Sequence, residues 1–349
     1  MKIRILTIHN IPNFGSIFQT YALARFLKEN GYDDVEVIDY NPSYFKPHTL
    51  KAIIGMILNW GSYLRRKSKF RNFIKNNIPL TKTSFSNNEE LRNAQIEADI
   101  FIAGGDQLWN VYHDCGKDDA YKLTFFKGKK ISYSTSMGQA SFPEQDLNDL
   151  SAKIKDFSAV SVREQSSVDL LRKVGIEAVS SVDPVYLLPS STYEQLLPEV
   201  HEPPYLLVYL VTPSKLLEDS IALLSKKYGL KVILCSGFSK KCTCDKFLKD
   251  LGPDEILSYI RNAEIVLSSS FHATSFSLIF EKQFFTILPD VHTNERIENL
   301  LKIRGLSDRI ITEASDLTIE LNKQIDYAKI SSYQLKVEES VNYLYENLK

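Results

Sequence analysis

The segment SSSFHATSFSL, residues 268–278, places one of the chain's six histidines shortly after a run of serines. An apolar run precedes the serines and a helical pattern follows, so we expect His272 where a buried strand leads into a helix. Serine hydroxyls cap such helices and the first helical amides bind anions, which makes Ser269 and Ser270 candidate anion-binding residues. His272 over this site could donate a proton near neutral pH. A histidine that only fills a buried position is an equally open interpretation.

Two arginines could supply positive charge to an anionic ligand. Arg163 ends the apolar segment AVSVRE, and Arg296 lies in a helical pattern after the apolar segment FFTIL. A guanidinium at the carboxyl end of a strand can hold a phosphate or carboxylate through two parallel hydrogen bonds. An ion pair of Arg163 with Glu164 or with a helix carboxylate would explain the same position without a ligand.

A second group of polar residues is typical of sugar recognition. The segment GGDQLWN, residues 104–110, places Asp106, Gln107 and Trp109 after two glycines. Asp106 is the candidate for a catalytic base or for a carboxylate that orients a hydroxyl, and Gln107 and Trp109 are candidate acceptor-binding residues. Asn13, in the short loop NFGS before a helix, is a further acceptor candidate. The alternative is a turn in which Trp109 belongs to the core.

These candidates follow or flank the ends of expected strands. Strands are predicted at 2–8, 35–40, 98–105, 130–136, 159–164, 178–184, 205–211, 231–236, 264–269 and 284–288. The strands are apolar and alternate with helical patterns, which predicts parallel sheets covered by helices. Ligands of such sheets bind outside the carboxyl ends of the strands.

The length of 349 residues predicts two domains, because single cores rarely grow beyond ~250–300 residues. We expect an α/β protein with two Rossmann-like domains that face each other across a cleft. The N-terminal domain spans 1–190 and is the expected acceptor side, and the C-terminal domain spans 200–325 and is the expected donor side. A C-terminal helix within 326–349 could pack back on the N-terminal domain. The proline-rich segment 187–204 is the expected linker.

Composition and motifs argue against several classes of protein. The net charge of −1 does not favour nucleic-acid binding, and no loop reads GxGxxG or GxxxxGK[ST]. The four cysteines lack the spacing of a zinc site or a disulfide framework, so neither a metal nor a cofactor is expected. The N-terminal segment MKIRILTIHN reads as a strand and not as a signal peptide, which favours a cytoplasmic location.

Six segments together resemble the polysaccharide pyruvyl transferase family: NFGSIFQTYALARFLKENGY, FIAGGDQLWN, ISYSTSMG, SVREQSSVDLLRKVG, VDPVYLL and SSSFHATSFSLIFEKQFFTI. The resemblance implies a GT-B-like fold and the transfer of a pyruvyl group from phosphoenolpyruvate to sugar hydroxyls in surface polysaccharide biosynthesis. It also implies a catalytic role for His272 and a donor-binding role for Arg163, whereas Arg296 matches the donor role by position only. Relatives often carry an arginine or aspartate before this histidine and a glycine after it, where this chain has Ser269, Ser270 and Ala273.

Two other functions stay open. A nucleotide-sugar-dependent glycosyltransferase of the GT-B type would need a carboxylate for the ribose hydroxyls, and Glu281 is the nearest candidate. A non-catalytic sugar-binding or assembly protein would not need His272 for turnover. Fold alone does not choose among these functions.

The segment 50–75 belongs to a stretch, residues 41–88, that contains no Asp or Glu. Its apolar residues lie close to one helical face, and basic residues follow: Ile53, Ile54, Ile57, Leu58, Trp60, Tyr63 and Leu64, then Arg65, Arg66, Lys67, Lys69, Arg71 and Lys75. A helix on an anionic membrane surface, such as the inner face of the membrane where lipid-linked acceptors reside, would show this pattern. An ordinary helix whose apolar face is core would show it as well.

Overall fold

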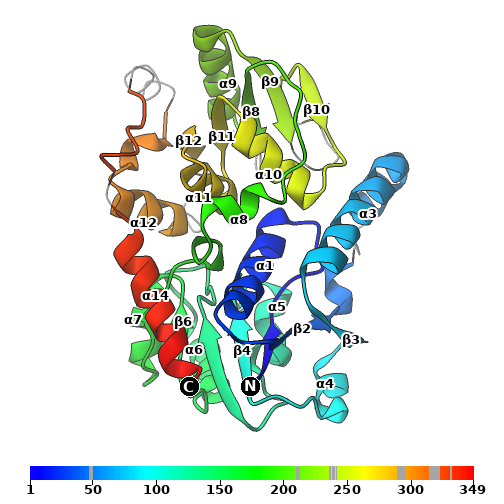
Figure 1. The fold of residues 1–349 in the computed structure, drawn as a ribbon, viewed down its shortest axis with the longest axis vertical. Helices are drawn as coiled ribbons and strands as arrows, with labels where there is room; N and C mark the ends of the chain where they lie inside the picture. Colours follow the sequence, from blue (N-terminus) through cyan, green and yellow to red (C-terminus); the bar gives the residue numbers. More distant parts are fainter. Residues whose placement is uncertain are drawn as a thin grey trace. The chain divides into compact units, whose positions relative to one another are not determined.

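The computed structural model describes residues 1–46, 50–209, 213–235, 237, 240, 242–288, 295–313, 323–330 and 332–349, and of residues 50–53 only the backbone. The chain divides into two compact units. Unit 1 comprises Met1–His48, Arg71–Leu188 and Gln334–Lys349, and unit 2 comprises Thr49–Phe70 and Pro189–Tyr333. Each unit contains a parallel sheet with helices, the α/β class that the sequence predicts (Figure 1).

The sheet of unit 1 has the strand order β3-β2-β1-β4-β5, and all its pairs are parallel. Its strands are β1 (Lys2–Leu6), β2 (Asp34–Tyr40), β3 (Leu80–Phe85), β4 (Ile100–Gly104) and β5 (Lys129–Tyr133). Every residue of β4 is buried, as expected for a strand covered on both faces. The order of strands reverses between β1 and β4, and the loops after these two strands are where open α/β sheets bind ligands.

The helices of unit 1 connect these strands: α1 (Phe14–Glu29), η1 (Ser43–Phe45), α4 (Asn88–Ala94), α5 (Asp114–Lys117), η2 (Asp119–Lys122), α6 (Glu144–Ile154), α7 (Gln165–Lys173), η3 (Pro184–Tyr186) and α14 (Gln334–Asn347). Two short strands, β6 (Ser161–Val162) and β7 (Val179–Ser180), pair in parallel, and bridges from Ile131 and Thr135 join β6 and the residues before it to the β5 segment.

The C-terminal helix α14 packs on unit 1. The hydroxyl of Ser340 accepts a hydrogen bond from the Val182 amide at 3.0 Å, and the Tyr343 hydroxyl donates to the Ser132 carbonyl at 2.9 Å. In Figure 1 this helix, drawn in red, crosses the β6 side of the unit. Residues 326–330, 332 and 333, which the sequence analysis joined to the helix, belong to unit 2 instead.

The sheet of unit 2 has the order β10-β9-β8-β11-β12-β13, again parallel throughout. Its strands are β8 (Tyr205–Tyr209), β9 (Lys231–Cys235), β10 (Lys246–Leu248), β11 (Ile265–Ser268), β12 (Gln283–Ile287) and β13 (Ile310–Ile311). Its helices are α2 (Leu50–Leu58), α8 (Ser190–Glu194), α9 (Lys215–Tyr228), α10 (Pro253–Asn262), α11 (Phe271–Ile279), α12 (Glu295–Arg304) and η4 (Ser307–Arg309). The strand order reverses between β8 and β11, so their carboxyl ends mark the expected ligand position.

Two segments belong to unit 2 although the sequence suggested otherwise. The expected linker is packed, since Tyr193 of α8 is fully buried with its ring edge-on to Phe276 at 5.1 Å. Residues 49–70 were placed in the first domain, but they join unit 2. The helix α3 (Trp60–Asn77) begins in unit 2, where Arg65 pairs with Asp250 at 2.5 Å and Lys69 pairs with Glu255 at 2.7 Å.

Candidate active-site residues at the carboxyl ends of the strands

His272 lies where β11 leads into α11, in the first turn of that helix, as the sequence predicts. The turn is built by serines. The Ser268 hydroxyl donates to the Tyr209 carbonyl at 2.9 Å and accepts from the Ser270 amide at 2.9 Å, while Ser270 caps α11 by accepting from the Ala273 amide at 3.4 Å. The His272 side chain is held close to the surface but largely covered, with 8% exposed. This is the position where strand order reverses in unit 2.

Arg296 and His272 both contact the ring of Phe271. The Arg296 guanidinium lies over the Phe271 ring, 5.5 Å from its centroid, and the Phe271 and His272 rings meet edge-on at 5.2 Å. Because β11 and β12 are neighbours in the sheet, the helices that follow them begin side by side. The structure therefore brings Arg296 and His272, two predicted site residues from separate segments, to one place.

The remaining residues of this region differ in their surroundings. Ser269 is buried with 6% exposed, and Ser270 serves as the helix cap described above. Glu281, the carboxylate that a nucleotide-sugar enzyme could use, follows the opposite end of α11 and is exposed. Its place confirms that it is a helix-end residue and separates it from His272 by the length of the helix.

In unit 1, Asp106 is fixed at the point where strand order reverses. It follows β4 in a left-handed backbone conformation with φ of 54°, after Gly105 with φ of 62°. Its carboxylate accepts hydrogen bonds from the Ser16 hydroxyl of α1 and from the Gln107 amide, the latter at 2.8 Å. A side chain at Gly105 would overlap Gln19, so glycine is required by a close approach as well as by its backbone angle. The loop after β4 is thus bound directly to the first turns of α1.

The other acceptor candidates are not equivalent. Asn13 is exposed and caps α1 by accepting from the Gly15 amide at 3.0 Å, and Gln107 is partly buried and accepts from the Asn110 side chain at 2.8 Å. Trp109 is a correction: it is fully buried, its indole nitrogen donates to the Tyr121 carbonyl at 3.0 Å, and its ring meets Phe157 edge-on. Trp109 is therefore a core residue, because a buried ring has no face on which a sugar could stack.

Arg163 forms a buried ion pair. Its guanidinium lies 2.7 Å from the Asp183 carboxylate, and the two side chains are only 5% and 0% exposed. The sequence left two partners open, Glu164 and a helix carboxylate, and the structure has the second, since Asp183 caps η3. The Glu164 carboxylate accepts instead from Ser136, the Met137 amide and Ser167. The charge of Arg163 is balanced inside unit 1, so its donor-binding role stays a prediction.

The thiols of the chain are not poised for nucleophilic chemistry. Burial, reinforced by the negative charge of Asp106, raises the pKa of the Cys115 thiol to about 12, and burial raises the pKa of Cys242 to about 12 as well. A thiol with such a pKa stays protonated at neutral pH and is a poor nucleophile. Among the described residues, no group of His, Cys, Asp and Glu side chains could hold a metal ion.

Sequence reasoning missed several polar contacts that shape these sites. Ser16, Gln19 and Asp183 lie in the segments that carry the family resemblance, yet nothing in their spacing shows that Ser16 contacts Asp106 across 90 positions. The signal available in the sequence was that these residues lie near the ends of predicted strands, where ligands of parallel sheets bind. This rule selects the loops but does not predict the contacts within them.

The comparisons with known proteins agree with this geometry. The family model described as "Polysaccharide pyruvyl transferase" matches residues 13–290. None of the curated proteins searched matched the chain.

Solved structures show the same fold at low sequence identity. The UDP-GlcNAc 2-epimerase of Methanocaldococcus jannaschii, solved with UDP-GlcNAc and UDP, is 15% identical with a TM-score of 0.57, and the alignment covers 99% of this chain and 100% of that one. The MnaA–UDP structure from S. aureus is 11% identical with a TM-score of 0.58 over 100% and 97% of the two chains. The UDP-GlcNAc 2-epimerase of Neisseria meningitidis is 10% identical with a TM-score of 0.55 over 100% and 99%. The fold is therefore GT-B-like.

Proposed function

Because the chain belongs to the polysaccharide pyruvyl transferase family, we propose that it transfers a pyruvyl group from phosphoenolpyruvate to sugar hydroxyls in surface polysaccharide biosynthesis. The observation that carries this proposal is the position of His272 in the first turn of α11, beside Phe271 and Arg296. An imidazole, a guanidinium and a helix N-terminus together suit a reaction that protonates an anionic substrate.

The chemistry assigns a separate task to each group. A proton is added to the methylene carbon of phosphoenolpyruvate, a sugar hydroxyl attacks the adjacent carbon, and a second hydroxyl displaces phosphate to close the ketal. The two hydroxyls release two protons: one balances the proton added to carbon and the other leaves with phosphate. We assign the proton donation to His272. General acid catalysis of this kind typically accelerates a reaction by ~10²–10⁴. Arg296, Ser269, Ser270 and the first amides of α11 are assigned to the negative groups of the donor.

The acceptor is assigned to the loops of unit 1 that follow β1 and β4. Asp106 is proposed to orient or deprotonate a sugar hydroxyl, since its carboxylate is fixed by Ser16 and by the Gln107 amide. Asn13 and Gln107 offer amide groups at the same loops. Arg163 is the donor residue implied by the family motif, and its ion pair with Asp183 would have to be shared with a ligand.

The test is a direct assay of transfer. Purified protein is incubated with phosphoenolpyruvate and candidate oligosaccharides, and phosphate release and the mass of the acceptor are followed together. Phosphate release that depends on the acceptor, with a pyruvyl group gained by the sugar, supports the proposal. Transfer from UDP-sugars in place of phosphoenolpyruvate would contradict it and would point to a glycosyltransferase. Binding of sugars without turnover of any donor would point to a non-catalytic protein.

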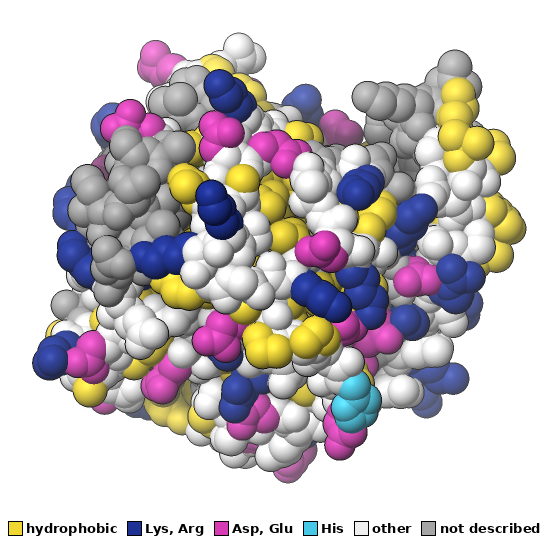
Figure 2. Space-filling model, turned by 90° about the horizontal axis from the view of Figure 1, so that it is seen from above, with side chains coloured by type: hydrophobic (Ala, Val, Ile, Leu, Met, Phe, Trp, Pro, Cys, Tyr) yellow, Lys and Arg dark blue, Asp and Glu magenta, His cyan; other side chains and the backbone are white. Residues whose placement is uncertain are grey.

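The surface of α2 and the start of α3 supports a membrane partner for this activity. Five large hydrophobic side chains are exposed within residues 54–64: Ile54 at 47%, Ile57 at 60%, Leu58 at 78%, Trp60 at 51% and Leu64 at 44%. Figure 2 shows hydrophobic side chains gathered at the right edge of the view, on the side where α3 lies in Figure 1. For these five residues the interpretation as core is wrong. Ile53, predicted on the same face, is among the residues whose side chains are not described.

Apart from Arg66, which lines a cavity, the basic residues of this segment divide into two groups. Arg65 and Lys69 form ion pairs with Asp250 and Glu255, so part of their charge is used within unit 2. Lys67, Arg71 and Lys75 are exposed on the same helix as Trp60 and Leu64. Exposed apolar and aromatic side chains beside exposed cations fit an anionic lipid surface, to which each cation adds ~1 kcal/mol. We therefore propose peripheral docking on anionic lipid, which would bring the enzyme to lipid-linked acceptors.

Vesicle co-sedimentation tests the docking proposal. Among the described residues no helix is both long and apolar enough to cross a bilayer. We expect binding to vesicles that contain phosphatidylglycerol, loss of binding at high salt, and a loss of at least ~10-fold in Leu58→Asp. Leu335→Asp, at a position 67% exposed on α14, is the matched control and should bind normally. Equal binding by both variants, or a Leu58-dependent dimer without vesicle binding, would refute the proposal.

A further inference from the structure

A cavity of about 50 Å³ lies within unit 2, at the carboxyl end of its sheet. Its floor consists of Tyr209, Cys235 and Leu248, the last residues of β8, β9 and β10, which are register partners across the three strands. The remaining lining residues are Arg66, Gly237, Lys249, Leu251 and Ile256. The cavity is therefore on the edge of the sheet where α/β proteins place their ligands.

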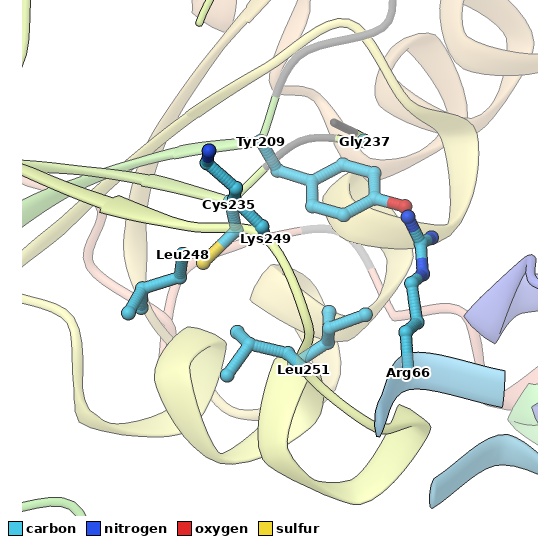
Figure 3. A pocket seen from close by; sticks show the side chains of 8 residues that line it. Arg66, Tyr209, Cys235, Gly237, Leu248, Lys249 and Leu251 are labelled. Carbon is cyan, nitrogen blue, oxygen red and sulfur yellow. The ribbon is translucent and has the colours of Figure 1, made fainter. Parts of the chain in front are cut away.

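Arg66 enters this cavity from α3. In Figure 3 its guanidinium lies next to the hydroxyl of Tyr209, while Leu251 lies on the opposite side of the cavity from the strand ends. Neighbouring residues fix the helix that carries it: Arg65 pairs with Asp250, Lys69 pairs with Glu255, and Lys249 donates to the Asn59 side chain at 3.3 Å. The position of the guanidinium is thus set by contacts on both sides of it along α3.

The surroundings of Arg66 disfavour its charge. Burial lowers the pKa of Arg66, and its two polar neighbours stay neutral at pH 7, because burial raises the pKa of Tyr209 to about 12 and raises that of the Cys235 thiol. Lys249 also lines the cavity, but its ammonium donates to the Asn59 side chain and lies over the Phe247 ring. An anion beside the Arg66 guanidinium would favour its charged form.

We infer that this cavity binds a small oxyanion, a phosphate or carboxylate group, at the Arg66 guanidinium. The volume of about 50 Å³ exceeds the ~10–15 Å³ that a cavity needs to hold one water molecule, and a guanidinium holds such a group through two hydrogen bonds. The site adjoins the His272 turn, since the carbonyl of Tyr209 accepts the Ser268 hydroxyl. The oxyanion can therefore be a free ion or one end of a larger anionic ligand held at the end of β8.

Calorimetric titration of the full chain tests the site with three probes: inorganic phosphate, phosphoenolpyruvate and UDP. We expect Arg66→Gln to weaken at least one of these by ~10-fold or more, because one partner of a charge-assisted contact is lost. Arg66→Lys should lose less. Lys67→Gln removes the same charge from the neighbouring, exposed position of α3 and should bind as the wild type does.

The three titrations show which molecule supplies the oxyanion, and they test this site independently of the proposed reaction. Weaker phosphate binding in Arg66→Gln indicates a free ion, and weaker binding of phosphoenolpyruvate or UDP alone indicates part of a larger ligand. Equal binding of all three probes by Arg66→Gln and Lys67→Gln overturns the inference. If Arg66→Gln fails to fold by circular dichroism, Arg66→Lys takes its place with the same criteria, since it keeps the charge but loses the two-bond geometry. His272→Gln should keep this binding even if it abolishes turnover, so the two proposals can fail separately.

Discussion

At the scale of single residues, His272 is buried, with 8% exposed, but other residues hold its helix in place. Ser270 caps α11, and the fully buried Phe276 anchors it. We expect His272→Gln to reduce pyruvyl transfer by ~10²-fold or more and to leave the melting temperature nearly unchanged. Activity close to that of the wild type would remove the histidine from the acid role. Phe276→Ala is the contrasting variant and should unfold the protein at lower temperature.

The buried pair of Arg163 and Asp183 makes a second prediction. Asp183→Asn leaves the guanidinium buried without its counter-charge, which typically costs ~3–5 kcal/mol. Denaturant unfolding measures the loss. The control is Asp169→Asn, which breaks the exposed Arg172–Asp169 contact at 3.2 Å and should cost ~1 kcal/mol or less. A small effect of Asp183→Asn would show that the arginine does not depend on Asp183 and would favour its role in donor binding.

The sequence predicted a residue's position well where neighbouring residues determine it, and poorly where contacts with distant segments determine it. His272 could be placed because a serine-capped helix after an apolar strand is a local pattern. Trp109 could not be placed, because a tryptophan after a turn can either stack on a ligand or fill the core, and only the contact with Phe157 decides. The sequence could not choose between Glu164 and a helix carboxylate as the partner of Arg163, because the partner, Asp183, lies 20 residues further along the chain and is brought close only by the fold.

At the scale of elements, α14 is held to unit 1 by a small number of directed contacts. The Ser340 hydroxyl accepts from the buried Val182 amide and donates to the Lys336 carbonyl at 2.7 Å. We expect Ser340→Ala to leave that amide without its acceptor and to lower the free energy of unfolding by ~1–3 kcal/mol. Glu338→Ala, at an exposed position of the same helix, should change it by ~0.5 kcal/mol or less. Equal effects of the two would mean that α14 packs without this hydrogen bond.

Most of the elements followed from periodicity, and those that did not are short or polar. β11, for example, was predicted at 264–269 and is Ile265–Ser268. β10 and β13 have only three and two residues, too few to show an alternating pattern. β3 was missed because the sequence LTKTSF is polar and exposed over much of its length, as an edge strand can be.

At the scale of the whole molecule, the buried tyrosines and cysteines predict sensitivity to alkali. Burial raises the pKa of Cys115, Cys242, Tyr209 and Tyr259 to about 12, from ordinary values of 9.0 and 10.0. The folded chain then keeps protons that the unfolded chain loses, so the stability from these groups is complete below pH 9 and falls as the pH rises toward 12.

Lys122 acts in the opposite direction. Burial lowers its pKa to about 8, so between pH 8 and its ordinary value of 10.5 the folded state binds fewer protons than the unfolded state and gains stability as the pH rises. Urea unfolding at pH 8, 9, 10 and 11 should show a net loss of unfolding free energy as the pH rises, because the thiols and phenols with raised pKa values outnumber Lys122. A stability that increases steadily over that range would contradict the burial of the phenols and thiols.

The division of the chain into units has a consequence for its biosynthesis on the ribosome. Unit 2 takes its last residues from the segment that ends at Tyr333, whereas unit 1, which contains the N-terminus, includes Gln334–Lys349. Translation therefore supplies all of unit 2 before unit 1 can be completed. The strands of unit 1 are therefore made well before α14, because the intervening 145 residues, Pro189–Tyr333, are synthesised between unit 1's earlier segments and this helix. A nascent chain of this protein exposes the Val182 and Ser132 contacts of α14 until the final turns of that helix leave the exit tunnel.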